Sequence, residues 1–272
     1  MKVHLYWAVA LLFAGCATYQ SKISEPRTLL KAGQFAKSIE LFGNLAKEES
    51  KDQLIYSLDY ATALQISGDY SQSAKEFIKA DKLISLNDFH SVSGLVGATL
   101  GGEEMVQYKG ESFEKFLLNV INSLNYVMLG QVDEAVVEAR IINDKINKMR
   151  MDGRDPYEPS PFARYLSGIL WESQRNFDSA YIEYEAAYKL DPLNPFIQQD
   201  LLRISRLSHR TESLQKWKNQ FGGQKEDPSS VSKENGELVV IFQQGWGPEK
   251  HPSKNYRFPQ LVPQFSKRER LY

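Results

Sequence analysis

Hydrophobic and small residues recur in one arrangement at four places along the chain. In each copy an aromatic or aliphatic residue follows a turn, a small residue lies three positions later, and further packing residues follow at helical spacing. The four sets are Gly33, Phe35, Ser38, Phe42 and Leu45; Gly68, Tyr70, Ser73, Phe77 and Ala80; Gly130, Val132, Ala135, Ala139 and Ile142; and Phe177, Ala180, Tyr184, Ala187 and Pro192. This pattern predicts a helix packed closely on the preceding helix, with a turn at each glycine, where a left-handed backbone is cheap.

The segment before each turn carries matching positions. A small residue lies seven positions before the turn, and a large residue follows three positions later. The pairs are Ala61 with Leu64, Ser123 with Tyr126, and Gly168 with Trp171. These helix pairs resemble tetratricopeptide (TPR) repeats, whose unit is 34 residues. The chain is therefore predicted to be all-α, with a TPR-like helical solenoid of about four helix pairs over residues 26–221 and a terminal capping helix, Pro195–Leu207.

The distances between equivalent positions predict two insertions in this solenoid. Gly33 and Gly68 are 35 residues apart, close to one repeat. Gly68 and Gly130 are 62 apart, which leaves about 28 extra residues around Leu86–Glu111. The third and fourth units are 45 apart, which leaves about 11 around Lys148–Ser160. The second insertion is rich in glycine, proline and aspartate, and is predicted to be a loop.

The C-terminal part of the chain has a different character. Residues 222–235 are polar and are predicted to form a linker. The run Gly236–Phe242 is typical of a single β-strand in a small β-containing tail, residues 236–272. One strand is not stable alone. Its partner could be a hairpin segment within Asn255–Val262, a second copy, or a continuation of the chain.

The N-terminus resembles a bacterial lipoprotein signal over residues 1–15. The apolar run Leu5–Ala14 is shorter than the ~20 residues of a membrane-spanning helix and is typical of a secretory signal. Ala14 and Gly15 before Cys16 resemble a lipobox, although Phe13 stands where an aliphatic residue is usual. The resemblance implies that Cys16 is acylated and becomes the first mature residue, with residues 16–25 as anchor and tether. The alternative is an ordinary cleavable signal with an incidental cysteine.

The residue after the cysteine bears on location. It is Ala17, and not the aspartate that typically retains lipoproteins in the inner membrane. We therefore expect lipid anchoring in the bacterial outer membrane, with the folded body in the periplasm.

Composition narrows the classes of function. Hydrophobic residues make up 42% and charged residues 25%, as in ordinary globular proteins. The 33 basic and 34 acidic residues give a net charge of −1, and the one dense basic run, at 267–270, is interrupted by Glu269. No nucleic-acid partner is expected, because such binding needs a clustered positive surface. The single cysteine excludes an intramolecular disulfide and a cysteine-rich metal site.

Catalytic patterns are not found. The glycine-rich run 94–102 lacks the lysine of a phosphate-binding loop, and no nucleophile-elbow motif occurs. The four histidines, at positions 4, 90, 209 and 251, lie far apart in sequence. The acidic pairs Glu48–Glu49 and Glu103–Glu104 are adjacent rather than opposed, so they do not suggest acid–base work. We predict no catalytic residue, cofactor or metal, and therefore no enzyme.

An ordered series of segments resembles one group of bacterial TPR lipoproteins with no established reaction. The resemblance covers roughly Tyr108–Phe242, about half the chain. It implies the fold and the envelope location more than a mechanism, and many members continue further after the strand, which would make this final domain abbreviated or truncated. The matching segments are Tyr108–Lys115, Ser123–Tyr126, Leu129–Gly130, Asp133–Arg140, Pro161–Gly168 and Gly236–Val240 with Gly245.

Six residues are candidates for contact with a partner. Asn119, Asn122 and Asn125 recur every three residues on one apolar helix, beside Tyr126. Their amides could bind the backbone of an extended peptide, or they could make hydrogen bonds between helices, which we favour because buried amides need partners. Arg140 and Arg164 match positions of the resembling group, and either recognise an acidic partner or brace helices.

These observations favour a protein-interaction scaffold in assembly or maintenance of the cell envelope. Its partner would be another envelope protein or a peptide, and Cys16 would hold it to the membrane. The alternative is a cell-wall glycan-binding or glycan-processing protein, with its site in the Leu86–Glu111 insertion or the C-terminal strand region.

Overall fold

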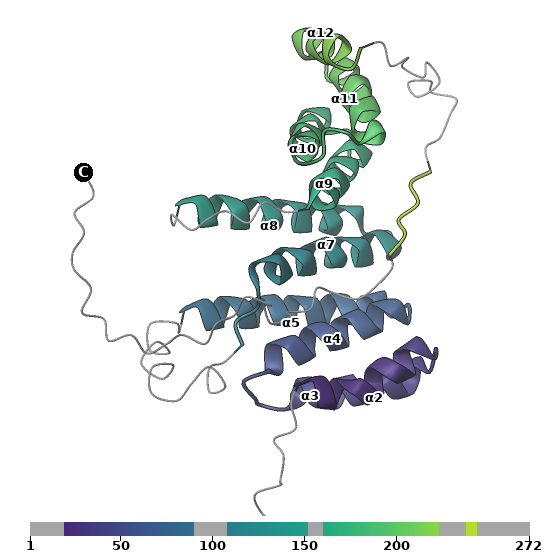
Figure 1. Ribbon diagram of the computed structural model, residues 1–272, viewed down its shortest axis with the longest axis vertical. Coiled ribbons are helices and arrows are strands. Elements are labelled where there is room, and N and C mark those ends of the chain that lie inside the picture. The colour runs from purple at the N-terminus through teal and green to yellow at the C-terminus, as the bar shows by residue number, and fades with distance from the viewer. Residues whose placement is uncertain (1–18, 90–107, 152–159, 223–237, 244–272) are drawn as a thin grey trace, which may run out of the picture. The chain divides into compact units, whose positions relative to one another are not determined.

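The computed structural model describes residues 19–89, 108–151, 160–222 and 238–243 (Figure 1). The chain divides into two units, Met1–Pro228 and Ser229–Tyr272. In the first unit the described residues form ten helices: α2 Tyr19–Lys31, α3 Phe35–Lys47, α4 Gln53–Ile66, α5 Tyr70–Phe89, α7 Ser112–Met128, α8 Val132–Met151, α9 Pro161–Ser173, α10 Phe177–Leu190, α11 Pro195–Leu207 and α12 Thr211–Gln220.

The described helices pair into five antiparallel hairpins through turns of one kind. In each turn one residue has a positive φ, and its N–H donates to the carbonyl three residues earlier, while the next N–H donates to the carbonyl five residues earlier. This is the hydrogen-bond pattern of a Schellman helix end. The positive-φ residues are Gly33, Gly68, Gly130, Arg175 and His209.

The fold class predicted from the sequence is confirmed, with one more hairpin than expected. The four predicted helix pairs are present. Helix α11, which was predicted to be a single cap, is followed by α12 and forms a fifth pair with it. The fifth turn escaped prediction because His209, and not glycine, takes the left-handed conformation, as Arg175 does in the fourth. The two positions are 34 residues apart (209 − 175), so the repeat length was the available signal.

The small residues of the repeat lie where two helices approach most closely. Ser38, Ser73, Ala135 and Ala180 are completely buried. The hydroxyls of Ser38 and Ser73 each donate across the hairpin, 2.8 Å to the carbonyls of Pro26 and Ala61. At Gly168 a Cβ atom would lie 2.4 Å from the ring of Tyr184, so α9 and α10 can touch there only because the position is glycine.

The hydrophobic core is divided among the junctions of the stack. The buried members of each of four clusters come from three successive helices among those described, so that every hairpin buries its apolar surface against the next one, as in other repeat proteins. Representative members are Ile23, Phe42 and Tyr56 for α2–α4; Leu54, Phe77 and Leu118 for α4–α7; Phe116, Ile142 and Leu166 for α7–α9; and Tyr184, Leu201 and Trp217 for α10–α12.

The prediction that residues 16–25 form a tether is wrong for residues 19–25. Helix α2 begins at Tyr19, so residues 19–25 are helical and belong to the first hairpin. The reason is that Ile23 is completely buried against Phe42 and its neighbours, which a polar composition alone concealed. The predicted signal, residues 1–15, and Cys16 lie outside the described residues.

The predicted C-terminal strand is also wrong where it can be compared. Residues 238–243 form neither helix nor strand, and Leu238, Val240 and Phe242 are exposed. A strand needs a neighbouring strand, and the described part of the chain supplies none. Gly236, Glu237 and most of the predicted linker lie outside the described residues, as do 90–107 and 152–159 of the two insertions.

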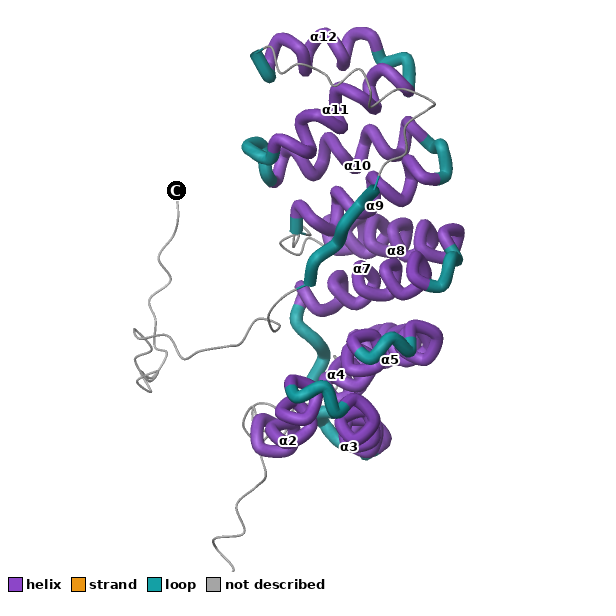
Figure 2. Tube along the Cα trace, turned by 90° about the vertical axis from the view of Figure 1, so that its right-hand side faces the viewer, coloured by secondary structure: helices purple, strands orange, loops and turns teal. Residues whose placement is uncertain are grey.

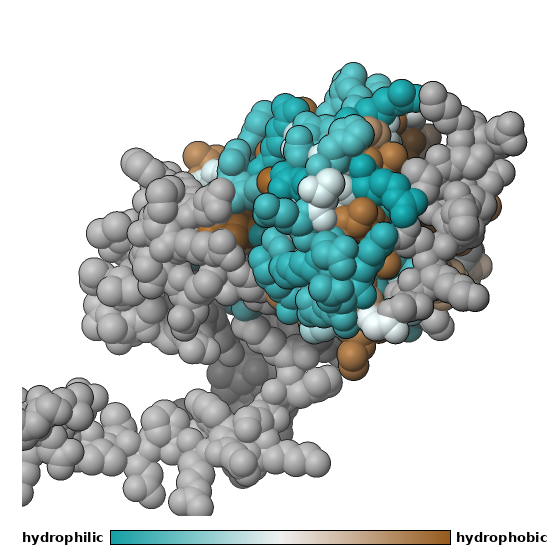
Figure 3. Space-filling model, turned by 90° about the horizontal axis from the view of Figure 1, so that it is seen from above, coloured by the Kyte–Doolittle hydropathy of each residue, from teal (hydrophilic) through white to brown (hydrophobic). Residues whose placement is uncertain are grey.

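The C-terminal end of the stack is polar. The exposed side chains of α12 are Thr211, Glu212, Gln215, Lys216, Lys218, Asn219 and Gln220, and this end is largely hydrophilic in Figure 3. On its inner side α12 buries Trp217, which stacks on Phe221. Helix α12 therefore closes the hydrophobic core. Within the described residues, no helix has the length and apolar character needed to cross a membrane.

Candidate functional site

The three candidate asparagines lie inside the stack. Asn119, Asn122 and Asn125 are on the buried side of α7, and all three are at most 2% exposed. The Asn125 amide donates to Ser73 Oγ at 2.9 Å and accepts from Gln65 Nε2 at 3.0 Å. These bonds join α7 to both helices of the preceding hairpin. In this arrangement the amides are used between helices, as the favoured interpretation supposed, and they are not presented to a peptide.

A buried carboxylate, Glu138 on α8, receives the other two amides. Asn119 and Asn122 donate to its two oxygens at 2.6 and 2.8 Å. Burial raises the pKa of the Glu138 carboxyl, which the two amide hydrogen bonds partly oppose; the Asp81 charge raises it further and the Lys145 charge lowers it. Sequence reasoning missed Glu138, which lies within the Asp133–Arg140 segment.

Lysine 145 extends the same group of contacts to α5. Its Nζ lies 2.6 Å from Asn119 Oδ1 and 2.6 Å from Asp81 Oδ1, and it also donates to the Lys115 carbonyl at 2.9 Å. We call the connected side chains of Gln65, Ser73, Asp81, Asn119, Asn122, Asn125, Glu138 and Lys145 the central network. It spans α4, α5, α7 and α8 and holds two hairpins in register.

Two other candidates, Tyr126 on α7 and Arg140 on α8, lie nearer the surface. Tyr126 packs against the α7–α9 cluster together with Trp171. The Arg140 guanidinium lies over the Trp171 ring, 4.8 Å from its centroid, a cation–π arrangement. Arg140 is exposed, so this candidate remains available to a partner as well as to Trp171.

Arg164 braces helices. It is largely buried on α9 and forms an ion pair with Glu183 of α10 at 3.1 Å. It also donates to Asn143 of α8, whose amide in turn donates to Glu183 at 2.6 Å. Three helices are thus joined by one guanidinium, one amide and one carboxylate. These contacts agree with a role of Arg164 in bracing helices. A ligand could bind Arg164 only by displacing them.

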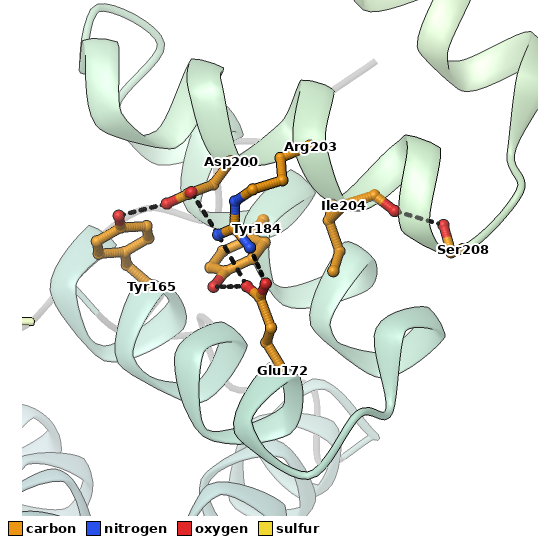
Figure 4. A network of polar contacts seen from close by, with 7 residues as sticks. All are labelled: Tyr165, Glu172, Tyr184, Asp200, Arg203, Ile204 and Ser208. Atoms are coloured by element: carbon orange, nitrogen blue, oxygen red, sulfur yellow. Dashed lines mark hydrogen bonds and ion pairs between the residues drawn. The ribbon is translucent and has the colours of Figure 1, made fainter. Parts of the chain in front are cut away.

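A second polar group, absent from the sequence predictions, lies between α9, α10 and α11 (Figure 4). Arg203 contacts both oxygens of Glu172, with 3.0 Å from Nη2 to Oε2, and lies 2.6 Å from Asp200. Tyr184 donates to Glu172 at 2.7 Å, and Tyr165 donates to Asp200 at 2.5 Å. We call these five residues the C-terminal network. Its one sequence signal was the i,i+3 pair Asp200–Arg203 on a predicted helix.

The first junction of the stack has a smaller polar link. The Tyr19 hydroxyl of α2 donates to Asp59 of α4 at 2.7 Å. Burial raises the pKa of the Asp59 carboxyl to about 6, although the hydrogen bond from Tyr19 opposes the rise. Junctions at both ends of the stack are therefore fixed by side-chain hydrogen bonds.

Chemically, the polar groups described so far bind each other. Their carboxylates accept from amides, hydroxyls, guanidinium groups or the Lys145 ammonium, mostly of neighbouring helices. Within the described ranges no three metal-ligating side chains gather. His209 occupies the turn between α11 and α12. The predicted glycan alternative placed its site in Leu86–Glu111 or in the strand region, of which residues 86–89, 108–111 and 238–243 are described.

An exposed apolar surface lies at the tight turns of two neighbouring hairpins. Gln65 and Asn125 bind each other near the C-terminal ends of α4 and α7, so these two helix ends are adjacent. We call the exposed apolar residues there the tight-turn patch. Its members are Ile66, Val127, Met128 and Leu129, with exposed fractions of 49, 38, 59 and 38%.

Known structures with similarity to the chain include several TPR proteins. A TPR protein from Parabacteroides merdae has 11% identity and a TM-score of 0.48, covering 74% of this chain and 64% of that one. YrrB, described as a TPR protein with an unusual peptide-binding site, has 12% identity and a TM-score of 0.47, covering 74% and 82%. MamA from Desulfovibrio magneticus has 14% identity and a TM-score of 0.44, covering 73% and 88%. No protein-family model and no curated protein sequence matches the chain.

Proposed function

We propose that the protein is a bacterial lipoprotein, held in the outer membrane through acylated Cys16, whose TPR-like body binds another envelope protein or a peptide. The role is that of a scaffold in envelope assembly or maintenance, without catalysis. Support for a binding role comes from the use of the polar side chains. In both networks the polar side chains bind one another between helices and hold the stack rigid. A partner would therefore bind to the outer surface of this rigid body.

The tight-turn patch is the surface that favours a protein partner most. Large apolar side chains that protrude together from a polar surface are typical of interaction sites. Met128 is the most exposed of the four, and its flexible thioether adapts to the shape of a partner. The adjacent central network fixes α4 and α7 relative to one another, so the four side chains keep their spacing when a partner binds.

The decisive experiment is site-specific crosslinking in intact cells. A photoreactive amino acid at Met128 is expected to form a covalent adduct with one defined protein, which mass spectrometry can identify. The matched control is the same probe at Ile182, an apolar residue with 58% exposure on α10 and outside the patch. Adducts that are absent, or equal from both positions, would contradict docking at the patch.

Anchoring is tested separately. Cys16→Ser is expected to abolish palmitate incorporation, because the acylated atom is the cysteine sulfur and the chain has no other cysteine. Unchanged labelling of the variant would refute acylation at Cys16 and leave the question of the protein partner untouched.

A further inference from the structure

The tight-turn patch lies in two turns whose charged residues are all acidic. Residues 65–74 and 125–137, which include these turns, contain three acidic residues and no lysine, arginine or histidine. The three are Asp69, Asp133 and Glu134, which we call the acidic rim; all of them are exposed. Each is three to five residues from a member of the patch. The two hairpins are neighbouring layers of the stack (Figure 2), so the apolar and acidic side chains belong to one surface.

The other tight turns differ in charge. The first turn has Lys31 and Lys37 on its two sides and no acidic residue between them. The fourth turn has Arg175 in its left-handed position, and the fifth has Arg210 directly after His209. Unopposed negative charge is therefore confined to the second and third turns, which are the two that carry the patch.

The stability of the helices explains only part of the acidic rim. Asp69 accepts the Gln72 N–H at 3.1 Å at the start of α5, and the other two rim residues lie in the first turn of α8, where the helix dipole favours negative charge. In the first turn of α10 the acidic residue, Asp178, is paired with Arg210. Within the described part of the chain, no carboxylate of the rim forms an ion pair. Its charge can therefore be neutralised by a partner.

We propose that the tight-turn patch binds a basic amphipathic segment of another protein. Apolar side chains of this segment cover the patch, and the lysine or arginine residues beside them face the acidic rim. The inference rests on the proposed function, because it names the chemistry of the partner that binds at the same surface. Charge complementarity of this kind speeds association and discriminates against partners of the wrong charge.

The acidic rim also disfavours two other occupants of the patch. A second copy docked through the same surface would place its three carboxylates against these three, because a two-fold interface brings identical patches together. Like charges facing each other across an interface cost free energy. An anionic phospholipid surface attracts basic segments and repels acidic ones. A basic protein segment is the occupant that suits both the apolar patch and its rim.

The first test identifies the residues of the partner that contact position 128. The full-length protein carries a photoreactive amino acid there, in intact cells, and mass spectrometry maps the adduct in the partner sequence. The adduct is expected beside apolar residues and within about two helical turns, roughly seven residues, of lysine or arginine. An adduct in a segment without basic residues, in a second copy of this chain, or in phospholipid would overturn the inference.

The second test removes charge from the acidic rim. Asp133→Asn with Glu134→Gln preserves side-chain size and the oxygen that accepts from Gln174, and is expected to lower the yield of the adduct from position 128 severalfold. The matched control is Asp178→Asn with Glu212→Gln, which removes two exposed charges from the first turns of α10 and α12 and should leave the yield unchanged. Thermal melting monitored by circular dichroism confirms that both variants are folded.

Ionic strength tests the same attraction without a substitution. Crosslinking in isolated envelopes is compared at about 0.1 M and 1 M salt, between which the Debye length falls from about 10 to 3 Å. The yield from the unsubstituted rim is expected to fall at the higher salt, and the yield from the Asp133→Asn, Glu134→Gln variant is expected to change less.

The outcomes separate this inference from the proposed function. A defined protein adduct whose yield is insensitive both to the rim substitutions and to salt would overturn the basic partner and leave docking at the patch standing. Adducts that are absent, or equal from positions 128 and 182, would contradict docking at the patch, and the inference about the partner would fail with it.

Discussion

The two buried polar networks fix the stack by different chemistry. In the central network, neutral amides donate to Glu138. The one cation of this network, Lys145, donates to Asn119, which in turn donates to Glu138. In the C-terminal network a guanidinium contacts both carboxylates directly, because Arg203 binds Glu172 and Asp200. Burial of a carboxylate among amides raises its pKa, whereas direct ion pairing favours its charged form. Of these two networks, the central one is therefore expected to respond to pH, and the C-terminal one depends on a single arginine.

The largest effect is expected from Arg203→Met. Removing the guanidinium leaves two carboxylates, Glu172 and Asp200, without their cation, and breaking a buried ion pair from one side costs about 3–5 kcal/mol. Urea denaturation of the full chain should show this loss in the free energy of unfolding. Arg210→Met is the matched control: it breaks an exposed pair with Asp178 and should cost about 1 kcal/mol or less. Equal losses would show that the C-terminal network does not depend on direct ion pairing.

A smaller loss is expected in the central network from Asn125→Ala. The substitution removes the hydrogen bonds that Asn125 makes with Gln65 and Ser73. Each partner keeps one other bond, to the carbonyl of Ile121 or of Ala61, so the loss of the two buried bonds should cost about 1–3 kcal/mol. The comparison variant is Asn219→Ala on the exposed face of α12, for which a change within about 0.5 kcal/mol is expected. If Asn125→Ala proved as costly as Arg203→Met in denaturation, the distinction between amide and ionic bracing would not hold.

The smallest and most specific effect concerns pH. Because the pKa of Glu138 is raised in the folded protein, the folded state binds more protons than the unfolded state once the pH exceeds the ordinary pKa of glutamic acid. The stability due to the protonated carboxyl is therefore lost as pH rises from that value through the folded pKa. Burial also raises the pKa of Asp59, which therefore contributes to the same fall. Glu138→Gln should make the fall smaller without removing it, in a series of urea denaturations across roughly pH 4–8, the range around the glutamic acid pKa. An identical slope in the variant would contradict the assignment to Glu138.

Individual residues show how far the sequence predicted the candidate sites. The spacing of Asn119, Asn122 and Asn125 identified one face of a helix, and the favoured role between helices agrees with their contacts. The sequence could not supply their partners, because Gln65 is 60 residues from Asn125 and Glu138 lies on another helix. Arg203 and Glu172 were missed for the same reason, since they are 31 residues apart and meet only when α9 and α11 stack.

The sequence by itself determined the helical hairpins. Apolar residues at helical spacing, small residues at the crossings and glycine at three turns act within one repeat, so the information is local and can be read along the chain. Tertiary structure decided the left-handed turns at Arg175 and His209, the start of α2 at Tyr19, and the pairing of every buried polar group. Those outcomes depend on what a neighbouring hairpin places within hydrogen-bonding distance or buries, and that is not encoded in the spacing of nearby residues.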